Sequence, residues 1–181
     1  MYEHSSSHGR REREVYKYLR NVKSRHTGFV LVRRAIDDFQ ISSADNTYSY
    51  QCLVHPPLAM SLCELRNRVT EKVLPEDLLK PTLIHILLAV DFLHTEAKIV
   101  HTEFFNQILD MQENNAMLTM EDDSILVDFE EAERSTPSPR KMIGDRVIYS
   151  SRDLGIPKVH GRPILSDFDS STVEMINHPW H

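Results

Sequence analysis

The chain has 181 residues, of which 40% are hydrophobic and 27% charged, a composition typical of soluble globular proteins and unlike that of disordered or fibrous chains. Its formal net charge is −6, whereas nucleic-acid-binding proteins usually carry an excess of positive charge. We therefore expect no nucleic-acid partner. The two cysteines, Cys52 and Cys63, have no C-x-x-C neighbour, which argues against a disulfide framework and a zinc site.

The N-terminus is polar and lacks the apolar core of a signal peptide, and no uninterrupted apolar run approaches membrane-spanning length. We therefore expect no membrane partner and a cytoplasmic or nuclear location. The ten histidines form no H-E-x-x-H motif, which argues against a histidine metal site.

The first part of the chain predicts a tail, a helix and a hairpin. Residues 1–10 form a polar tail, and residues 11–22 place apolar side chains at helical spacing opposite a charged face. These apolar residues are Val15, Tyr18, Leu19 and Val22. Residues 29–41 and 48–54 are rich in β-prone residues on either side of a turn-forming stretch, which predicts two paired strands.

The middle of the chain predicts two helices. Two prolines after His55 break the preceding strand. Ser61, with Glu64 three residues later, is typical of a capping box and predicts a short helix to about Val69. Residues 75–95 repeat apolar side chains at the helical period, so we expect a long helix with much of its surface buried.

The last part of the chain is less regular. It predicts short strands at residues 99–100, 116–119, 125–129 and 163–168, followed by a polar tail. Between residues 130 and 161 a charged segment predicts a solvated insertion that packs weakly.

Two segments contain the acidic and amide residues that a magnesium–nucleotide site needs. The first reads Ile-Val-His-Thr from Ile99 and continues, seven residues later, as Asp-Met-Gln-Glu-Asn-Asn from Asp110. The second reads Ile-Leu-Ser-Asp-Phe-Asp from Ile164. Because hard cations such as Mg²⁺ prefer oxygen ligands, these segments are the candidate functional site.

These segments resemble the protein kinases, specifically the fungal serine/threonine kinases similar to the SR-protein kinases, whose catalytic loop commonly reads Val-His-Thr-Asp-Ile-x-x-x-Asn-Ile. The wider match includes YQCLVHPPLAMSL from Tyr50, LLKPT from Leu78, DFLHTE from Asp91, EDDSILVDFE from Glu121 and GRPILSDF from Gly161. It covers nearly all of residues 11–170, and the order and spacing of the pieces make it specific.

The resemblance implies an α+β fold, namely an incomplete two-lobed protein kinase-like fold. The implied parts are a small-lobe helix and hairpin in residues 11–54, a hinge in residues 55–60, a partial large lobe in residues 61–170 with an insertion at about residues 130–161, and a truncated activation-segment tail in residues 171–181.

The resemblance also implies roles for the acidic and amide residues. Phosphoryl transfer depends on positioning and charge neutralisation more than on covalent chemistry. Asp110 would be the catalytic aspartate that accepts a proton from the substrate hydroxyl, and Asn115 and Asp167 would hold Mg²⁺. His101 would pack beneath Phe168.

The position of the catalytic aspartate depends on an alignment step. The family pattern expects Asp directly after His-Thr, where this chain has Glu103. We interpret residues 103–109 as an insertion, because Asp110 then restores the Asp-x-x-x-x-Asn spacing. The alternative, in which Glu103 replaces the aspartate, leaves Asn115 too far away in sequence.

The resemblance further assigns an ATP-binding region. Glu12 would be the helix glutamate that pairs with an ATP-binding lysine, with Glu14 as a rival. His55 would occupy the gatekeeper position, and adenine would be recognised by the Pro56 carbonyl and the Leu58 amide.

Several departures from the family pattern predict weak or no activity for the chain alone. The glycine-rich loop and the lysine are not found, the chain stops before any Ala-Pro-Glu motif, Gln112 replaces a lysine, and Asp169 replaces a glycine. The expected function is therefore that of a protein kinase-like chain with ATP, Mg²⁺ and a protein substrate or partner. The alternatives are a pseudokinase-like protein-interaction module and a degenerate gene fragment.

Overall fold

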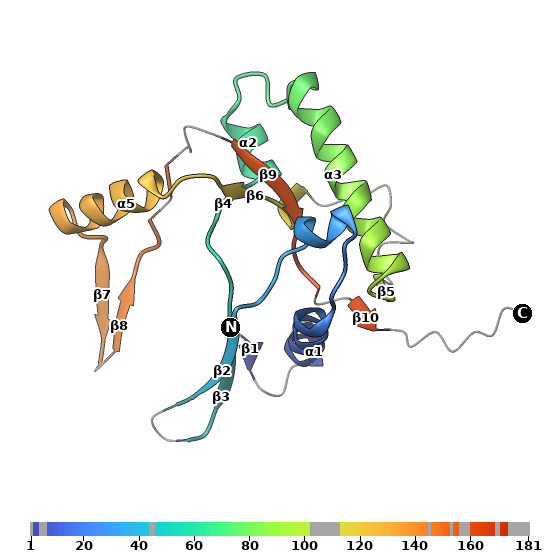
Figure 1. Ribbon diagram of the computed structural model, residues 1–181. Helices are drawn as coiled ribbons and strands as arrows, with labels where there is room; N and C mark the ends of the chain where they lie inside the picture. Colours follow the sequence, from blue (N-terminus) through green and yellow to red (C-terminus); the bar gives the residue numbers. More distant parts are fainter. Residues whose placement is uncertain are drawn as a thin grey trace, which may run out of the picture.

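The protein is represented by a computed structural model in which α1, α3 and three small sheets of the described strands form a body and α5 leads to a projecting hairpin (Figure 1). The residues that the structure describes are 2–3, 7–43, 46–101, 113–144, 146–152, 154–155, 160–168 and 171–173.

The helices are short except for α1 and α3. They are α1 (Ser7–Asn21), the 3₁₀ helix η1 (Thr27–Leu31), α2 (Leu62–Arg68), α3 (Glu76–Thr95), the 3₁₀ helix η2 (Glu113–Asn115) and α5 (Ser124–Ser135). The strands are β1 (Tyr2–Glu3), β2 (Asp37–Ser42), β3 (Ser49–Val54), β4 (Leu58–Ser61), β5 (Ile99–His101), β6 (Ala116–Met120), β7 (Arg140–Ile143), β8 (Arg146–Tyr149), β9 (His160–Leu165) and β10 (Ser171–Val173).

The N-terminal part confirms the predicted helix and hairpin and corrects their bounds. Residues 7–10, which we assigned to the tail, belong to α1. β2 and β3 pair antiparallel as predicted, but β2 starts only at Asp37, and the predicted strand before it is replaced by η1. A Cβ atom built at Gly28 in η1 would lie 1.9 Å from the Leu88 carbonyl oxygen of α3. The close approach of η1 to α3 therefore requires glycine at this position.

Helix α2 begins at the predicted capping box. The Ser61 hydroxyl accepts a hydrogen bond from the Glu64 amide at 3.1 Å, and the Glu64 carboxylate accepts one from the Ser61 amide at 2.7 Å. This reciprocal pair satisfies two amides that the first helical turn leaves without partners. The preceding strand β4 was not predicted.

Strands β4, β6 and β9 form a three-stranded antiparallel sheet in the centre of the body. Ala116 at the start of β6 pairs with Leu165 at the end of β9. Strands β5 and β10 form a second antiparallel pair, in which Ser171 lies opposite His101. Residues 171–173 are therefore a strand, and our prediction of an irregular tail was wrong for them.

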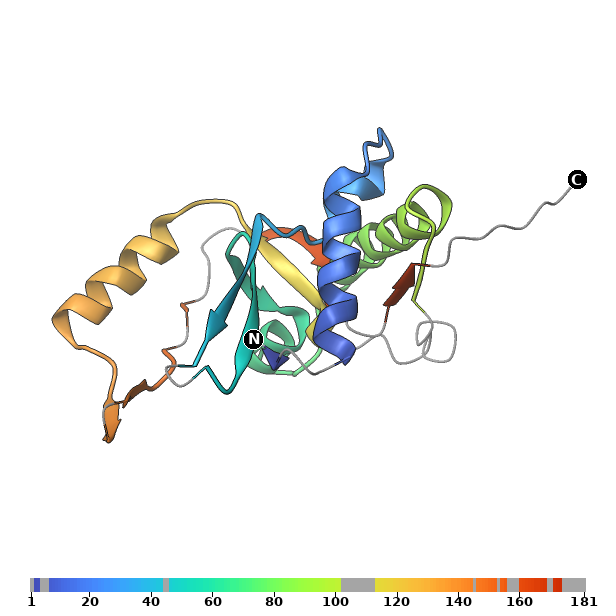
Figure 2. The ribbon, with the colours of Figure 1, turned by 90° about the horizontal axis from the view of Figure 1, so that it is seen from below.

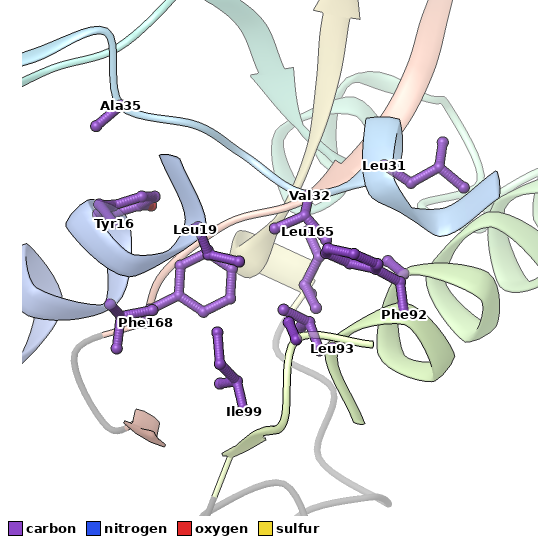
Figure 3. Packing of buried hydrophobic residues seen from close by; sticks show 13 residues of the cluster. Tyr16, Leu19, Leu31, Val32, Ala35, Phe92, Leu93, Ile99, Leu165 and Phe168 are labelled. Atoms are coloured by element: carbon purple, nitrogen blue, oxygen red, sulfur yellow. The ribbon is translucent and has the colours of Figure 1, made fainter. Parts of the chain in front are cut away.

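Two apolar clusters form the core. The larger one joins α1, η1, α3 and β9 (Figure 3). Its residues are Val15, Tyr16, Leu19, Leu31, Val32, Ala35, Ala89, Phe92, Leu93, Ala97, Ile99, Leu165 and Phe168. The smaller one lies between α2, α3, β4 and β6, and Val90 of α3 packs against both. Tyr16 is 1% exposed and Tyr18 37% exposed, so our choice of Tyr18 for the apolar face of α1 was wrong by half a turn.

Helix α3 confirms the predicted bounds but is buried on one face only. Ile86 and Phe92 are buried, whereas Leu79, Leu83 and Leu87 are exposed, which corrects our expectation of a largely buried helix. By length and composition alone α3 is also the one described helix that could cross a membrane. Core helices of soluble proteins share this property, and α3 packs into both core clusters.

Residues 124–149 form a projecting arm that consists of α5, β7 and β8 (Figures 1 and 2). The strand predicted at residues 125–129 is wrong, because these residues open α5. The four residues of β7 and the four of β8 are all exposed. Near the end of α5 that leads into the β7–β8 hairpin, Arg152 Nε donates to the Glu133 carboxylate at 2.5 Å. The hydroxyl and amide of Ser138 together with Arg152 lower the pKa of Glu133 to about 2.

Candidate functional site

Asn115 and Asp167 lie at the same end of the central sheet. Asn115 directly precedes β6, and Asp167 follows the end of β9 by two residues. The Ser166 amide donates to the Asn115 carbonyl oxygen at 2.8 Å, and the Ser166 hydroxyl donates to the same oxygen at 3.0 Å. The antiparallel register therefore brings together two predicted site residues that are far apart in sequence.

Asp167 has a backbone conformation that non-glycine residues rarely adopt. Its φ angle is +71°, in the left-handed region, which costs an L-residue about 1–2 kcal/mol. Its two neighbours hold it there, since Ser166 is hydrogen bonded to Asn115 and Phe168 is fully buried. Strain of this kind persists where the surrounding structure fixes it, and it is often found at functional sites.

Phe168 packs edge-to-face on Tyr16 of α1, with ring centroids 5.3 Å apart and an interplanar angle of 82° (Figure 3). The Tyr16 ring also meets the ring of His55 at 4.6 Å. The aromatic cluster of His55, Tyr16 and Phe168 thus connects α1 with the end of β3 and with the segment that carries Asp167. We had expected His101 beneath Phe168, but the His101 side chain lies outside the described residues, so this stays a prediction.

Glu12 lies one helical turn before Tyr16 and is only 9% exposed. Glu14 is exposed, so the helix turns Glu12, and not its rival, toward the core. Burial raises the pKa of the Tyr16 phenol well above its ordinary value, and the negative charges of Glu12 and Asp167 raise it further.

The Tyr16 hydroxyl has unusual surroundings for a buried polar group. The backbone amide of Asp167 and the charge of Arg33 oppose the rise of its pKa, yet among the described residues no partner meets the geometry of a regular hydrogen bond. A buried hydroxyl without a partner costs about 1–3 kcal/mol. The apolar cluster therefore encloses one polar group, the Tyr16 hydroxyl, that lacks a regular hydrogen bond among the described residues.

His55 is half-buried at the end of β3, and its Nδ1 lies 3.0 Å from the Arg34 carbonyl oxygen. Since a carbonyl only accepts, Nδ1 carries the proton. Burial lowers the pKa of His55; the hydrogen bond to Arg34 opposes this shift, and the charge of Arg33 adds to it. Pro56 is exposed, and Leu58 starts β4 opposite Thr119. His55 is thus adjacent to the site through Tyr16, and the predicted hinge connects the two sheets.

The remaining predicted site residue, Asp110, lies outside the described residues, as do Gln112 and the insertion 103–109. Two neighbours of the site, Tyr16 and Arg33, were missed. Tyr16 follows Glu12 by four residues, which places both side chains on the same face of a helix, so this spacing could have identified Tyr16. No sequence signal indicated Arg33.

The side chains of Asn115 and Asp167 carry oxygen atoms, the ligand type that a small hard cation prefers. The Asn115 amide and the Asp167 carboxylate would supply oxygen ligands from one end of the sheet, and Mg²⁺ usually takes few protein ligands together with phosphate oxygens. No group of three or more His, Cys, Asp or Glu residues of the kind that holds a metal by itself occurs in the described ranges.

Comparisons with known proteins agree with this geometry. Two serine/threonine protein kinases of Aspergillus fumigatus, from strains CEA10 and Af293, are each 39% identical to the chain over 166 residues, which are 90% of this chain and 37% of the relative. A kinase domain of known crystal structure matches 94% of this chain and 42% of its own length, with a TM-score of 0.53 and 17% identity. The fold of the chain is similar to part of a protein kinase domain.

The structural match confirms the predicted incomplete α+β kinase-like fold. The matched part of the chain spans 37% of the length of the Aspergillus kinases. No protein-family model matches the chain.

Proposed function

We propose that the chain binds ATP with Mg²⁺ at the end of the β6–β9 pair and acts as part of a serine/threonine protein kinase of the group similar to the SR-protein kinases. The observation that supports this proposal best is the placement of Asn115 and Asp167 side by side through the Ser166 hydrogen bonds. Glu12 lies on α1, one helical turn before Tyr16, and is buried.

Each residue of the site would have a limited task. Asn115 and Asp167 would hold Mg²⁺, which neutralises phosphate charge when bound. His55, Pro56 and Leu58 would border the adenine, and Phe168 would hold Asp167 in its strained conformation. Asp110 would orient the hydroxyl of the protein substrate and accept its proton.

We propose that phosphoryl transfer by this chain is weak. The seven residues 103–109 precede Asp110, and a misplacement of about 1 Å can cost about a hundredfold in rate. Gln112 and Asp169 also depart from the family pattern.

The experiment combines nucleotide binding with transfer. At an ATP concentration about 100 times its Kd, with Mg²⁺, the chain should gain about 2.7 kcal/mol in stability, measured as a melting shift. Asp167→Asn should abolish the shift, and Asp128→Asn, on the exposed face of α5, should retain it. Transfer of labelled phosphate to a serine-rich peptide should require Asp110. The absence of a shift in the unmodified chain would overturn the proposal.

A second candidate is a protein-interaction module without transfer. The observation that favours it is the arm, where β7 and β8 expose Met142, Ile143, Val147, Ile148 and Tyr149, since large exposed apolar groups often mark contact surfaces. A melting shift with ATP and no transfer by the unmodified chain would favour this function.

A further inference from the structure

The β7–β8 hairpin joins α5 through a small polar cluster at the end opposite its turn (Figure 1). We call this set, Glu133, Thr136, Ser138 and Arg152, the neck cluster. Glu133 lies in the last turn of α5, and Thr136 and Ser138 lie between α5 and β7. Arg152 follows β8. The end of α5, the entry to the hairpin and its exit therefore meet at the neck cluster.

The Glu133 carboxylate is the centre of the neck cluster. It accepts hydrogen bonds from the Ser138 hydroxyl and, at 3.0 Å, from the Ser138 amide. Arg152 Nε donates to the same carboxylate at 2.5 Å, and Arg152 Nη2 donates to the Thr136 carbonyl oxygen. The hydrogen bonds from Ser138, with the hydrogen bond and charge of Arg152, lower the pKa of Glu133 to about 2. The entry and the exit of the hairpin are thus both bound to one ionised carboxylate of α5.

The hairpin beyond the neck cluster is exposed. All eight residues of β7 and β8 are exposed, and the Ser150 amide donates to the Pro139 carbonyl oxygen at 2.8 Å, which extends the pairing of the two strands. A two-stranded hairpin alone is only marginally stable in water. The polar contacts of the neck cluster therefore hold the hairpin in its position relative to α5.

The sequence around Ser138 is typical of a phosphorylation site. Proline-directed protein kinases select a serine or threonine that precedes proline, often with a basic residue two positions after that proline. Ser138 is followed by Pro139, Arg140 and Lys141. Thr136 also precedes a proline, but Pro139 occupies the position of the basic residue. Ser138 is partly exposed and both basic residues are exposed, so the pattern selects Ser138.

We propose that Ser138 is a phosphorylation site for a proline-directed protein kinase and that its phosphate opens the neck cluster. The Ser138 hydroxyl oxygen forms a bond to the γ-phosphorus of ATP held by that kinase. The bond from this phosphorus to the bridging oxygen breaks, ADP leaves, and the hydroxyl proton passes to the catalytic base of that kinase. Because another enzyme performs the transfer, the inference does not depend on the proposed function of this chain.

A phosphate on Ser138 removes the contacts between the hairpin and α5. The hydroxyl no longer donates to Glu133, and a group with a charge of about −1.5 to −2 is placed next to the Glu133 carboxylate. Both negative groups lie at the C-terminal end of a helix, where the helix dipole disfavours negative charge. A guanidinium pairs strongly with phosphate, so Arg152 exchanges Glu133 for the phosphate. The entry and the exit of the hairpin then stay joined to each other but separate from α5.

Phosphorylation in vitro tests the site. The chain is incubated with Mg·ATP and a purified cyclin-dependent kinase, which is proline-directed, and the modified residue is located by mass spectrometry. We expect phosphate on Ser138, loss of that incorporation in Ser138→Ala, unchanged incorporation in Thr136→Ala and slower incorporation in Lys141→Ala. Modification of a peptide of residues 133–144 but not of the chain would overturn the proposal, because the serine would then be inaccessible in the fold. Incorporation on Thr136 alone, or none in either substrate, would also overturn it.

Hydrogen exchange tests the opening of the neck cluster. The Thr136 amide donates to the Ala132 carbonyl oxygen in the last turn of α5 at 2.9 Å. After phosphorylation this amide should exchange about tenfold faster, whereas the Ser150 amide within the hairpin should keep its protection. In the matched variant Glu133→Gln the repulsion is absent, so phosphorylation should change the exchange of the Thr136 amide by less than about twofold. Unchanged exchange in the phosphorylated unmodified chain, or an equal acceleration in Glu133→Gln, would overturn the proposed opening.

Discussion

The body around α1, α3 and β9 and the arm of α5, β7 and β8 both contain large apolar side chains but differ in their surroundings. Both contain apolar residues at regular spacing, yet Phe168 is fully buried in the body, whereas Tyr149 is 62% exposed in the arm. In the body the buried apolar side chains of the core cluster meet residues from other elements, whereas among the described strands β7 and β8 pair with each other alone. A two-stranded hairpin alone is marginally stable in water. The two regions therefore differ in the long-range packing of their apolar side chains and not in the local spacing of these side chains.

The largest difference between the regions is expected for an aromatic truncation. Phe168→Ala removes the edge-to-face contact with Tyr16 and leaves a cavity, which should lower the free energy of unfolding by about 4 kcal/mol. Tyr149→Ala in β8 should change it by less than about 0.5 kcal/mol. Urea unfolding of both variants measures the difference, and equal losses would show that the arm packs as firmly as the body.

A smaller difference is expected for glycine substitutions. Gly28→Ala places a Cβ atom against the Leu88 carbonyl oxygen, and the resulting separation of η1 and α3 should cost about 3 kcal/mol. A Cβ atom at Gly155, beyond the hairpin, would meet nothing within 4 Å, so Gly155→Ala should be nearly neutral or slightly stabilising. Thermal unfolding checks both, and an unchanged melting temperature for Gly28→Ala would show that η1 can move away from α3.

The smallest effect is expected when the charge of an ion pair at the edge of the body is removed. Asp38 of β2 pairs with Arg13 at 2.6 Å and with Lys17 at 3.5 Å on α1. Burial raises the pKa of Asp38, but the hydrogen bond and charge of Arg13 together with Lys17 outweigh it, and the net pKa is lowered. Since the two cations are partly exposed, Asp38→Asn should cost only about 1 kcal/mol at pH 7.

The pH dependence of this pair follows from the lowered pKa. The stabilisation is complete above the unfolded pKa of about 3.9 and is lost as the pH falls through the lower folded value. Unfolding measured from pH 7 to pH 2 should show the loss in the unmodified chain and a smaller one in Asp38→Asn. Parallel curves for the two proteins would contradict a lowered pKa.

The sequence predicted those elements whose signals are local. The capping box of Ser61 and Glu64 is complete within four residues, and α2 starts there as predicted. The predicted strand at residues 125–129 failed because its apolar run continues into good helix formers, with an i,i+4 ion pair between Glu130 and Arg134. The strand predicted from Phe29 failed because the contact of Gly28 with α3 is tertiary.

Family resemblance predicted some residues of the candidate site but not all of its neighbours. Resemblance indicated Glu12, Asn115 and Asp167, and the sheet register brings the last two together. It did not indicate Arg33, whose backbone amide donates to the Leu165 carbonyl oxygen of β9, because one sequence contains no signal for such a long-range contact.

The two strand pairings beside the site also determine how length changes are tolerated. The β5–β10 and β6–β9 pairings fix both ends of two connections, residues 102–115 and residues 166–170. The insertion predicted at residues 103–109 would lengthen only the first connection, and the entropy of closing a loop grows slowly with length. The chain can therefore accept insertions near Asp110 without altering the shorter connection that holds Asp167, so the contour length of one can evolve while the other stays constant.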